Sequence, residues 1–169
     1  LREWVTLNHN EDAIYYATLS TFQQEYEHPL RVFSLNYDRC VEIACAKASI
    51  SRGFDEGKKW DWRIFEPVDD PEIFLYKLHG SIDWERGEDG QVMYRDGYNN
   101  IKHDHLAIIF GTTYKLQYVD PFLFLAYEFR RWTLSTVRLI VAVGYGFLDD
   151  HINGIMGQAL KNNSAMKVL

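Results

Sequence analysis

The apolar run over residues 73–78, interrupted only by Lys77, limits the folds open to this chain. Such a run is typical of a strand that is buried on both faces of a parallel sheet. It ends at His79-Gly80, where the glycine lets the chain turn away. Residues 31–36 form a second strand-like run, which ends at Asn36-Tyr37-Asp38. If the two strands are parallel neighbours, their polar ends meet at the carboxyl edge of one sheet, where open α/β sheets bind ligands.

The rest of the chain alternates helical and strand-like segments. Helices are expected over residues 10–27, after Asp38, from Asp120 to about Thr136 and from Asp149 or Asp150 to about Lys161. Further buried strands are expected at 106–110 and 137–143, and a hairpin joins 81–86 to 91–95. Such alternation predicts an α/β fold with a doubly wound, mostly parallel sheet. Residues 1–169 are expected to be one domain that is incomplete at both ends, because a helix opens the chain and a strand at 165–169 is cut short.

Composition argues against several classes of function. The net charge of −6 argues against direct binding of nucleic acid. Two cysteines, Cys40 and Cys45, are too few for a disulfide framework or a four-thiolate zinc site, so buried reduced thiols are expected. In these 169 residues no charged segment followed by an apolar run marks a signal peptide, and no apolar run reaches the roughly 18 residues that a membrane span needs. A cytoplasmic location without membrane contact is therefore expected by elimination.

Several polar features have simple structural explanations. Gly144-Tyr145-Gly146 lies at a strand-to-helix turn, but the third glycine of a dinucleotide fingerprint falls on Asp149, so that pattern fails. His103 and His105 lack the further ligands that zinc requires, so a solvated loop and no metal are expected. His151 has no partner evident in the sequence and stays unassigned.

Asn36 and His79 are the strongest candidates for a functional site. Polar residues at strand ends often only satisfy backbone groups of loops. Both of these residues, however, follow inner strands of the predicted sheet, at the edge where such a sheet holds its ligand. Spacing alone favours a structural role, and this placement strengthens the case for a functional site.

Four motifs follow one another between residues 31 and 155. They are Asn36-Tyr37-Asp38, Leu78-His79-Gly80-Ser81, Gly111-Thr112-Thr113 with Val119-Asp120-Pro121, and Gly144-Tyr145-Gly146-Phe147-Leu148-Asp149-Asp150-His151-Ile152-Asn153. In this order and spacing they resemble the sirtuin-like (SIR2-like) domains of bacterial antiviral defence proteins. The resemblance implies a Rossmann-like fold that binds NAD.

The resemblance also implies roles for individual residues. His79 matches the catalytic base of that family, and Asn36 matches the asparagine at the nicotinamide ribose and reacting centre. Asp38 is expected near the nicotinamide amide. The remaining cofactor-binding candidates are Gly80 beside the base, Gly111, Thr112 and Thr113 on the ADP-ribose side (with Thr113 in place of serine), and Gly144 and Tyr145.

Two departures from the family pattern bear on the reaction. The Gly-Ala-Gly loop that holds the diphosphate is expected upstream of Leu1, so the 169-residue piece alone is expected to be weak or inactive. Protein-deacylating sirtuins use four cysteines for a structural zinc, and this chain has two. The resemblance therefore favours NAD cleavage without an acyl-lysine substrate, that is, an NAD glycohydrolase that depletes NAD in antiphage defence, over protein deacylation.

Two alternatives to an enzyme stay open. The same pocket can sense NAD or an ADP-ribose derivative without cleaving it. The chain can also be a scaffold whose many aromatic side chains, 15% of the sequence, pair with a partner subunit. A homo-oligomer or a partner protein in a defence complex is expected under the enzyme hypothesis.

Overall fold

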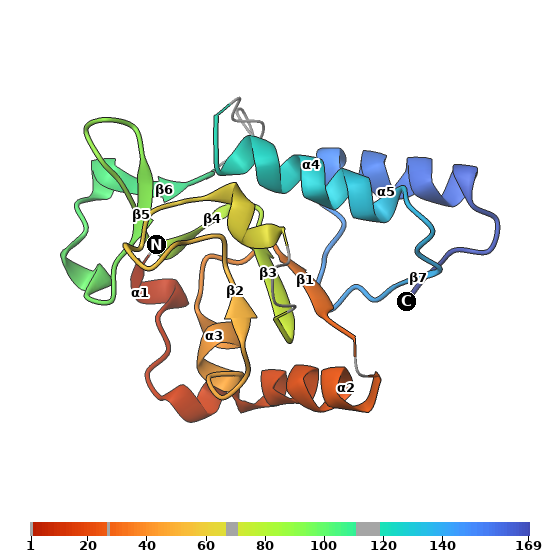
Figure 1. Cartoon of the computed structure of the whole chain (residues 1–169), viewed down its shortest axis with the longest axis horizontal. Helices are drawn as coiled ribbons and strands as arrows, with labels where there is room; N and C mark the ends of the chain where they lie inside the picture. The colour runs from red at the N-terminus through yellow and green to blue at the C-terminus, as the bar shows by residue number, and fades with distance from the viewer. Residues whose placement is uncertain (1, 27, 67–70, 111–118) are drawn as a thin grey trace.

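A three-stranded parallel sheet lies at the centre of the computed structural model, which describes residues 2–26, 28–66, 71–110 and 119–169 (Figure 1). Its central strand is β3 (Ile73–Lys77), with β1 (Leu30–Ser34) on one side and β2 (Ile50–Ser51) on the other. In the pairing of β1 with β3, Leu30 is opposite Ile73 and Ser34 is opposite Lys77. The prediction that these two strands are parallel neighbours is confirmed.

Strand β3 is buried along its whole length, as its apolar pattern predicts. Its aromatic side chains are central to the core, because the Tyr76 ring stacks on Phe33 of β1 and on Phe65, each at 4.5 Å between centroids. Lys77 is the exception in this apolar strand and is only 2% exposed. Its ammonium group donates a hydrogen bond to the backbone carbonyl of Asp38. A buried ammonium requires such an acceptor, because removal from water disfavours its charge.

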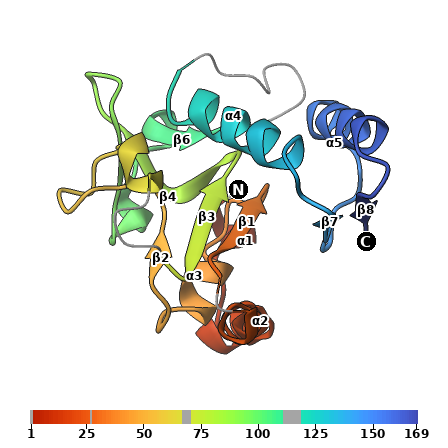
Figure 2. The same ribbon diagram turned by 45° about the vertical axis from the view of Figure 1, so that its right-hand side comes forward.

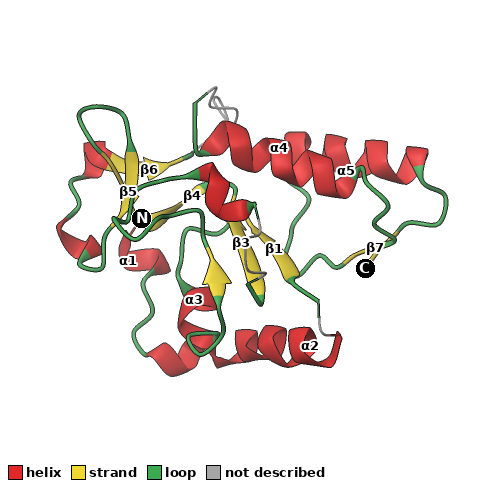
Figure 3. Ribbon diagram, in the orientation of Figure 1, coloured by secondary structure: helices red, strands yellow, loops and turns green. Residues whose placement is uncertain are grey.

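A second sheet continues directly from β3 and is antiparallel. Strand β4 (Gly80–Arg86) pairs with β5 (Val92–Tyr94) on one edge and with β6 (Leu106–Ile108) on the other (Figure 3). The predicted hairpin is confirmed. The prediction of a strand over 106–110 buried on both faces is wrong, since β6 is short and antiparallel and Phe110 is 69% exposed. An apolar run indicates a strand but not the strand with which it pairs. Here residues 106–108 pair with the edge of β4 that β5 leaves free.

Helices cover both faces of the central sheet. A 3-10 helix, η1 (Asn10–Ala17), continues into α2 (Thr18–Tyr26) and lies with α3 (Cys40–Ala44) on one face, while α4 (Phe122–Thr133) crosses the other face (Figures 1 and 2). The first half of the helix expected over residues 10–27 is thus a 3-10 helix. Helix α5 (Asp150–Asn162) packs beside α4. Among the described residues, the other helical segments are α1 (Arg2–Val5) and the 3-10 turns η2 (Trp62–Phe65), η3 (Tyr98–Asn100) and η4 (His103–His105).

One apolar cluster joins these layers. It contains Phe74 and Tyr76 of β3, Trp84 of β4, Leu125 of α4 and Ile155 of α5. Within the described ranges, no helix is both long enough and apolar enough to cross a membrane.

The C-terminal strands form a separate parallel pair at the side of the central sheet (Figure 2). Strand β7 (Leu139–Ile140) pairs with β8 (Lys167–Val168), which is the short strand expected at 165–169. The prediction of a buried strand over 137–143 is wrong, because Val141 and Val143 are 61% and 79% exposed. Apolar side chains in a strand are buried only where neighbouring elements cover them, and the expected single sheet is divided into three in the part of the chain that the structure describes.

Gly80 connects the two larger sheets and cannot be replaced without strain. Its φ of +82° lies in the left-handed region that side chains disfavour. A Cβ atom added here would overlap the carbonyl oxygen of Ala107 and lie 3.0 Å from the Cα of Ile108, both in β6. The turn after β3, and with it the position of His79, therefore depends on a glycine.

We predict that Gly80→Ala lowers the free energy of unfolding by about 1 kcal/mol for the backbone conformation and by roughly a further 1–3 kcal/mol for the displacement of β6. Gly90 provides the matched control, because its φ is +81° but an added Cβ meets no atom within 4 Å. Gly90→Ala should therefore cost only the backbone part. Urea denaturation of both variants measures the difference, and equal losses would contradict the close approach of Gly80 to β6.

Candidate functional site

The ends of β1 and β3 bring Asn36 and His79 to the same edge of the central sheet. The amide of Leu78 donates to the carbonyl of Ser34 at 2.9 Å, which extends the strand pairing beyond the Ser34–Lys77 pair. Asn36 and His79 each stand two residues past that pair, on strands that neighbour one another at about 4.8 Å. Both predicted residues thus follow the paired strands at this edge, where the Asn36 side chain is exposed and the His79 side chain is 17% exposed.

Several hydrogen bonds hold the loop that carries Asn36. The amide of Ile82 in β4 donates to the carbonyl of Tyr37 at 2.9 Å, and the Tyr37 hydroxyl donates to the carbonyl of Ile109 at 2.6 Å. The backbone amide of Asn36 donates to the Ser34 hydroxyl at 3.1 Å, and the Lys77 ammonium group donates to the backbone carbonyl of Asp38. Burial raises the pKa of Tyr37, so its hydroxyl stays a neutral donor. These contacts fix the backbone on both sides of Asn36.

Asp38 stands two residues before α3, the helix that follows the loop. Its Oδ1 atom accepts a hydrogen bond from the amide of Cys40 at 2.8 Å, at the start of α3. Burial, with a smaller contribution from the hydrogen bond to Asp38, raises the pKa of the Cys40 thiol to about 12. Cys40 and Cys45 are buried free thiols, as predicted, and Cys40 is protonated at neutral pH, so it does not act as a thiolate nucleophile there.

His79 lies against the first turn of α5, at a contact that the sequence pattern did not indicate. Its Nε2 atom is 3.3 Å from Oδ2 of Asp149, whose side chain is 7% exposed. The other carboxylate oxygen of Asp149 accepts from the amides of His151 and Ile152 at 3.1 and 3.3 Å. The amide of Ile109 donates to the carbonyl of His79 at 2.9 Å and fixes the backbone of the histidine. The sequence identified Asp149 only as a possible start of a helix, because no local signal relates it to His79.

The predicted cofactor-binding residues before α5 stand next to this contact. The Tyr145 hydroxyl donates to Oδ1 of Asn153 at 2.8 Å and lies 3.2 Å from the carbonyl oxygen of Asp149. Gly144 has a φ of +64°, is exposed and has no atom within 4 Å of the position of a Cβ, so its backbone can be approached closely. Gly80 packs directly against the backbone of β6, at Ala107 and Ile108. Gly111, Thr112 and Thr113 lie outside the described residues.

The other polar candidates do not join this site. His103 and His105 belong to η4, where His105 Nε2 is 4.0 Å from the carboxylate of Asp104. The side chain of His151 is exposed on α5. Across residues 2–26, 28–66, 71–110 and 119–169, no three His, Cys, Asp or Glu side chains are grouped as they would be to hold a metal ion.

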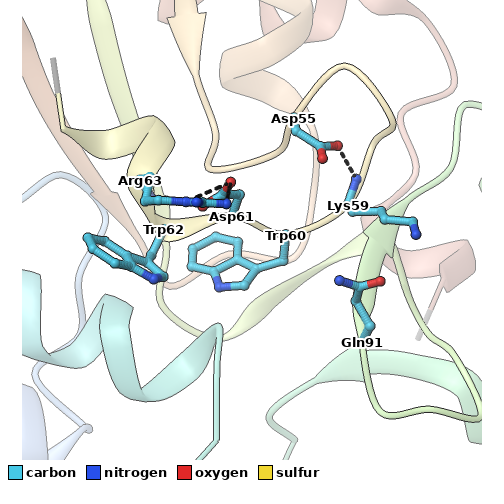
Figure 4. A pocket seen from close by; sticks show the side chains of 7 residues that line it. All are labelled: Asp55, Lys59, Trp60, Asp61, Trp62, Arg63 and Gln91. Carbon is cyan, nitrogen blue, oxygen red and sulfur yellow. Dashed lines mark hydrogen bonds and ion pairs between the residues drawn. The ribbon is translucent and has the colours of Figure 1, made fainter. Parts of the chain in front are cut away.

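A hollow of about 360 Å³ opens elsewhere on the molecule (Figure 4). It is lined by Asp55, Lys59, Trp60, Asp61, Trp62, Arg63 and Gln91. Two of its carboxylates already have partners within the hollow: Asp61 pairs with the Arg63 guanidinium at 2.7 Å, and Asp55 accepts from the amide of Lys59 at 2.9 Å. None of the lining residues follows β1 or β3, so this hollow is distinct from the site at the sheet edge.

Comparison with protein-family models matches residues 30–168 to a SIR2-like domain. The matched range begins with the first residue of β1 and ends within β8, so it includes Asn36, His79 and Asp149. The comparison with curated proteins found no match.

A network of ion pairs centred on the buried Asp83 joins β4 to the residues that follow the Asn36 loop. Asp83 of β4 is fully buried, and its Oδ2 atom is 2.7 Å from Nη2 of Arg52 and 3.3 Å from Nε of Arg39, the residue after Asp38. Arg52 in turn lies 3.5 Å from Glu42 of α3. Burial by itself raises the pKa of Asp83, but the Arg52 guanidinium and, more weakly, Arg39 outweigh it, so the pKa lies below its ordinary value. The carboxylate is therefore charged and joins β4 to the start of α3.

We predict that Asp83→Asn lowers the free energy of unfolding at pH 7 by about 3–5 kcal/mol, because two guanidinium groups lose a buried carboxylate. A folded-state pKa below the ordinary value means that this stabilisation is complete above the unfolded pKa of about 3.9 and is lost as the pH falls through the lowered pKa. The advantage of the wild type over the variant should therefore shrink only in strong acid. Asp96→Asn removes an exposed partner of Lys58 and should have little effect. Urea denaturation across the pH range tests both statements, and equal losses in the two variants would contradict a structural role for Asp83.

Proposed function

The chain belongs to the SIR2-like domain family, and from this membership together with the paired ends of β1 and β3 we propose that it is an NAD glycohydrolase. The observation that carries the proposal is the arrangement at one sheet edge of an exposed amide, Asn36, and a largely buried imidazole, His79. Open α/β sheets bind their ligands at this edge. NAD is the substrate in this proposal, and the reaction needs no metal.

The proposed reaction breaks the bond between C1′ of the nicotinamide ribose and the pyridine nitrogen. The electron pair of that bond leaves with nicotinamide, which becomes neutral, and the ribose passes through an oxocarbenium-like state. The oxygen of a water molecule then bonds to C1′ and releases one proton. The products are nicotinamide, ADP-ribose and that proton, so atoms and charge balance.

The residue types at the site suit this chemistry. Histidine is the side chain that exchanges a proton most readily near neutral pH, so His79 can take the proton from water or from a ribose hydroxyl. An asparagine amide carries both donors and an acceptor, so Asn36 can orient the water or the hydroxyl group. Because the loop of Asn36 is fixed by hydrogen bonds to β3, β4 and Ile109, the two groups keep their relative position, and positioning accounts for much of the acceleration in such sites.

The remaining contacts to NAD are proposed from the resemblance and from the surroundings of the site. Asp38 is proposed near the nicotinamide amide, Gly80 beside the base, and Gly111, Thr112 and Thr113 on the ADP-ribose side. Gly144 and Tyr145 are proposed as further contacts, which the open backbone of Gly144 supports. The resemblance to domains of bacterial antiviral defence proteins supports the proposal that NAD depletion serves antiphage defence, within a homo-oligomer or a complex with a partner protein.

We predict that His79→Ala and Asn36→Ala in the full-length protein each lower the rate of nicotinamide release from NAD by at least about 100-fold, the usual contribution of a general base. His103→Ala, an exposed histidine on η4, is the control and should keep the wild-type rate. Chromatography of nicotinamide and ADP-ribose gives the rates. Undiminished cleavage by either site variant would overturn the assignment.

Calorimetry of the wild type with NAD separates cleavage from sensing. Binding followed by release of nicotinamide supports the glycohydrolase. Binding without any nicotinamide released would overturn it in favour of a sensor of NAD or ADP-ribose, and no nucleotide binding at all would favour a scaffold.

A further inference from the structure

We propose that Asp149 is a positioning residue that sets the tautomer of the His79 imidazole, a role that rests on the proposed glycohydrolase function. Asp149 is 5% exposed and belongs to the N-terminal end of α5, far from His79 in the sequence. Folding brings its Oδ2 atom to 3.3 Å from Nε2 of His79. The pair joins the end of β3 to the first turn of α5.

The capping of α5 does not by itself account for an aspartate at this position. Oδ1 of Asp149 accepts the amides of His151 and Ile152, which is what a helix N-cap requires. Serine or asparagine would cap the helix about as well. An aspartate adds a second oxygen and a negative charge, and burial of a charge is unfavourable unless a partner compensates it. His79 lies where that second oxygen points.

The direction of the carboxylate is fixed by its surroundings. The two amides at Oδ1 hold one oxygen, and this leaves Oδ2 directed at the imidazole. The Tyr145 hydroxyl, which donates to Asn153, lies 3.2 Å from the carbonyl of Asp149. Asn153 donates its own side-chain amide to the carbonyl of Phe147 at 2.8 Å. Tyr145 and Phe147, which precede Asp149, are thus both hydrogen-bonded to Asn153 of α5.

A carboxylate at this place selects which nitrogen of His79 carries the proton. An ionised carboxylate only accepts hydrogen bonds, so the nitrogen that faces it, Nε2, is the protonated one. A neutral imidazole has a single N–H, and Nδ1 therefore keeps its lone pair and is the atom that can accept a proton. The separation of 3.3 Å is longer than a charge-assisted hydrogen bond of about 2.8 Å. Such contacts commonly tighten when substrate binds.

The variant Asp149→Asn separates this role from capping. The asparagine oxygen is retained at the amides of His151 and Ile152, so the amide NH₂ group takes the place of Oδ2 and donates to Nε2 of His79. The ring is then forced into the opposite tautomer, with the proton on Nδ1, while the helix cap is kept. Asp149→Ser keeps the cap but is too short to reach His79, and the ring is free to take either tautomer. Asp150→Ser removes one exposed acidic residue from the same turn and is the matched control.

The first readout is the ¹⁵N NMR spectrum of His79 in the folded full-length protein with labelled histidine, recorded at a pH where the ring is neutral. We expect the Nε2–H form in the wild type and in Asp150→Ser, the Nδ1–H form in Asp149→Asn and a mixture in Asp149→Ser. Loss of the signal in His79→Gln assigns it. The same tautomer in all four proteins would overturn the proposal. If Asp149→Asn does not fold, Asp149→Ser decides the question alone.

The second readout is the steady-state rate of NAD cleavage. We expect kcat to fall by at least about 100-fold in Asp149→Asn and by about 10-fold in Asp149→Ser, with KM for NAD and the thermal midpoint little changed. A role in capping alone would leave kcat unchanged in both variants, since both retain a good cap, and that result would overturn the proposal. The spectrum does not depend on turnover: a wild type without NAD cleavage but with the expected tautomers refutes the proposed function and not the role of Asp149.

Discussion

The parallel pairing of β1 with β3 determines where the residues of the proposed site emerge from the sheet. Its register, with Ser34 opposite Lys77, decides that the residues following the two strands emerge at one level of the sheet. A shift by one residue would turn the side chains of β3 to the opposite faces and separate Asn36 from His79. The stacked rings of Phe33 and Tyr76 hold this register from within the core, since they belong to the two paired strands.

Polar groups around the site hold the backbone on which Asn36 and His79 stand. The side chains of Lys77 and Tyr37 both donate hydrogen bonds to backbone carbonyl groups. Asp83 pairs with the guanidinium groups of Arg39 and Arg52. Lys77 and Asp83 are buried and the Tyr37 hydroxyl is partly buried, so each of these groups would be unfavourable there without its partner. The exposed Asn36 and the imidazole of His79 are thus carried on a backbone that these contacts hold in place, which favours a preorganised site.

The central part of the fold could be predicted from local patterns. The apolar run of β3, the hairpin of β4 and β5, and the helices α4 and α5 all follow from periodicity and turn residues. The predictions for residues 106–110 and 137–143 were wrong in the same way: both contain short strands, but neither joins the central sheet. Apolar composition predicts that a segment will be buried. Which element packs against it depends on the tertiary structure.

The amino-acid sequence alone indicates which residues stand at strand ends, and therefore that Asn36 and His79 are candidates at a ligand-binding edge. It also determined that Gly80 follows His79, although the reason, its close approach to Ala107, appears only in the fold. The tertiary structure alone decided that Asp149 meets His79 and that Asp83 holds Arg39 and Arg52. Periodicity and capping act over a few residues, but these contacts join segments far apart in the chain, and only the packing of α5 and β4 against the sheet brings them together.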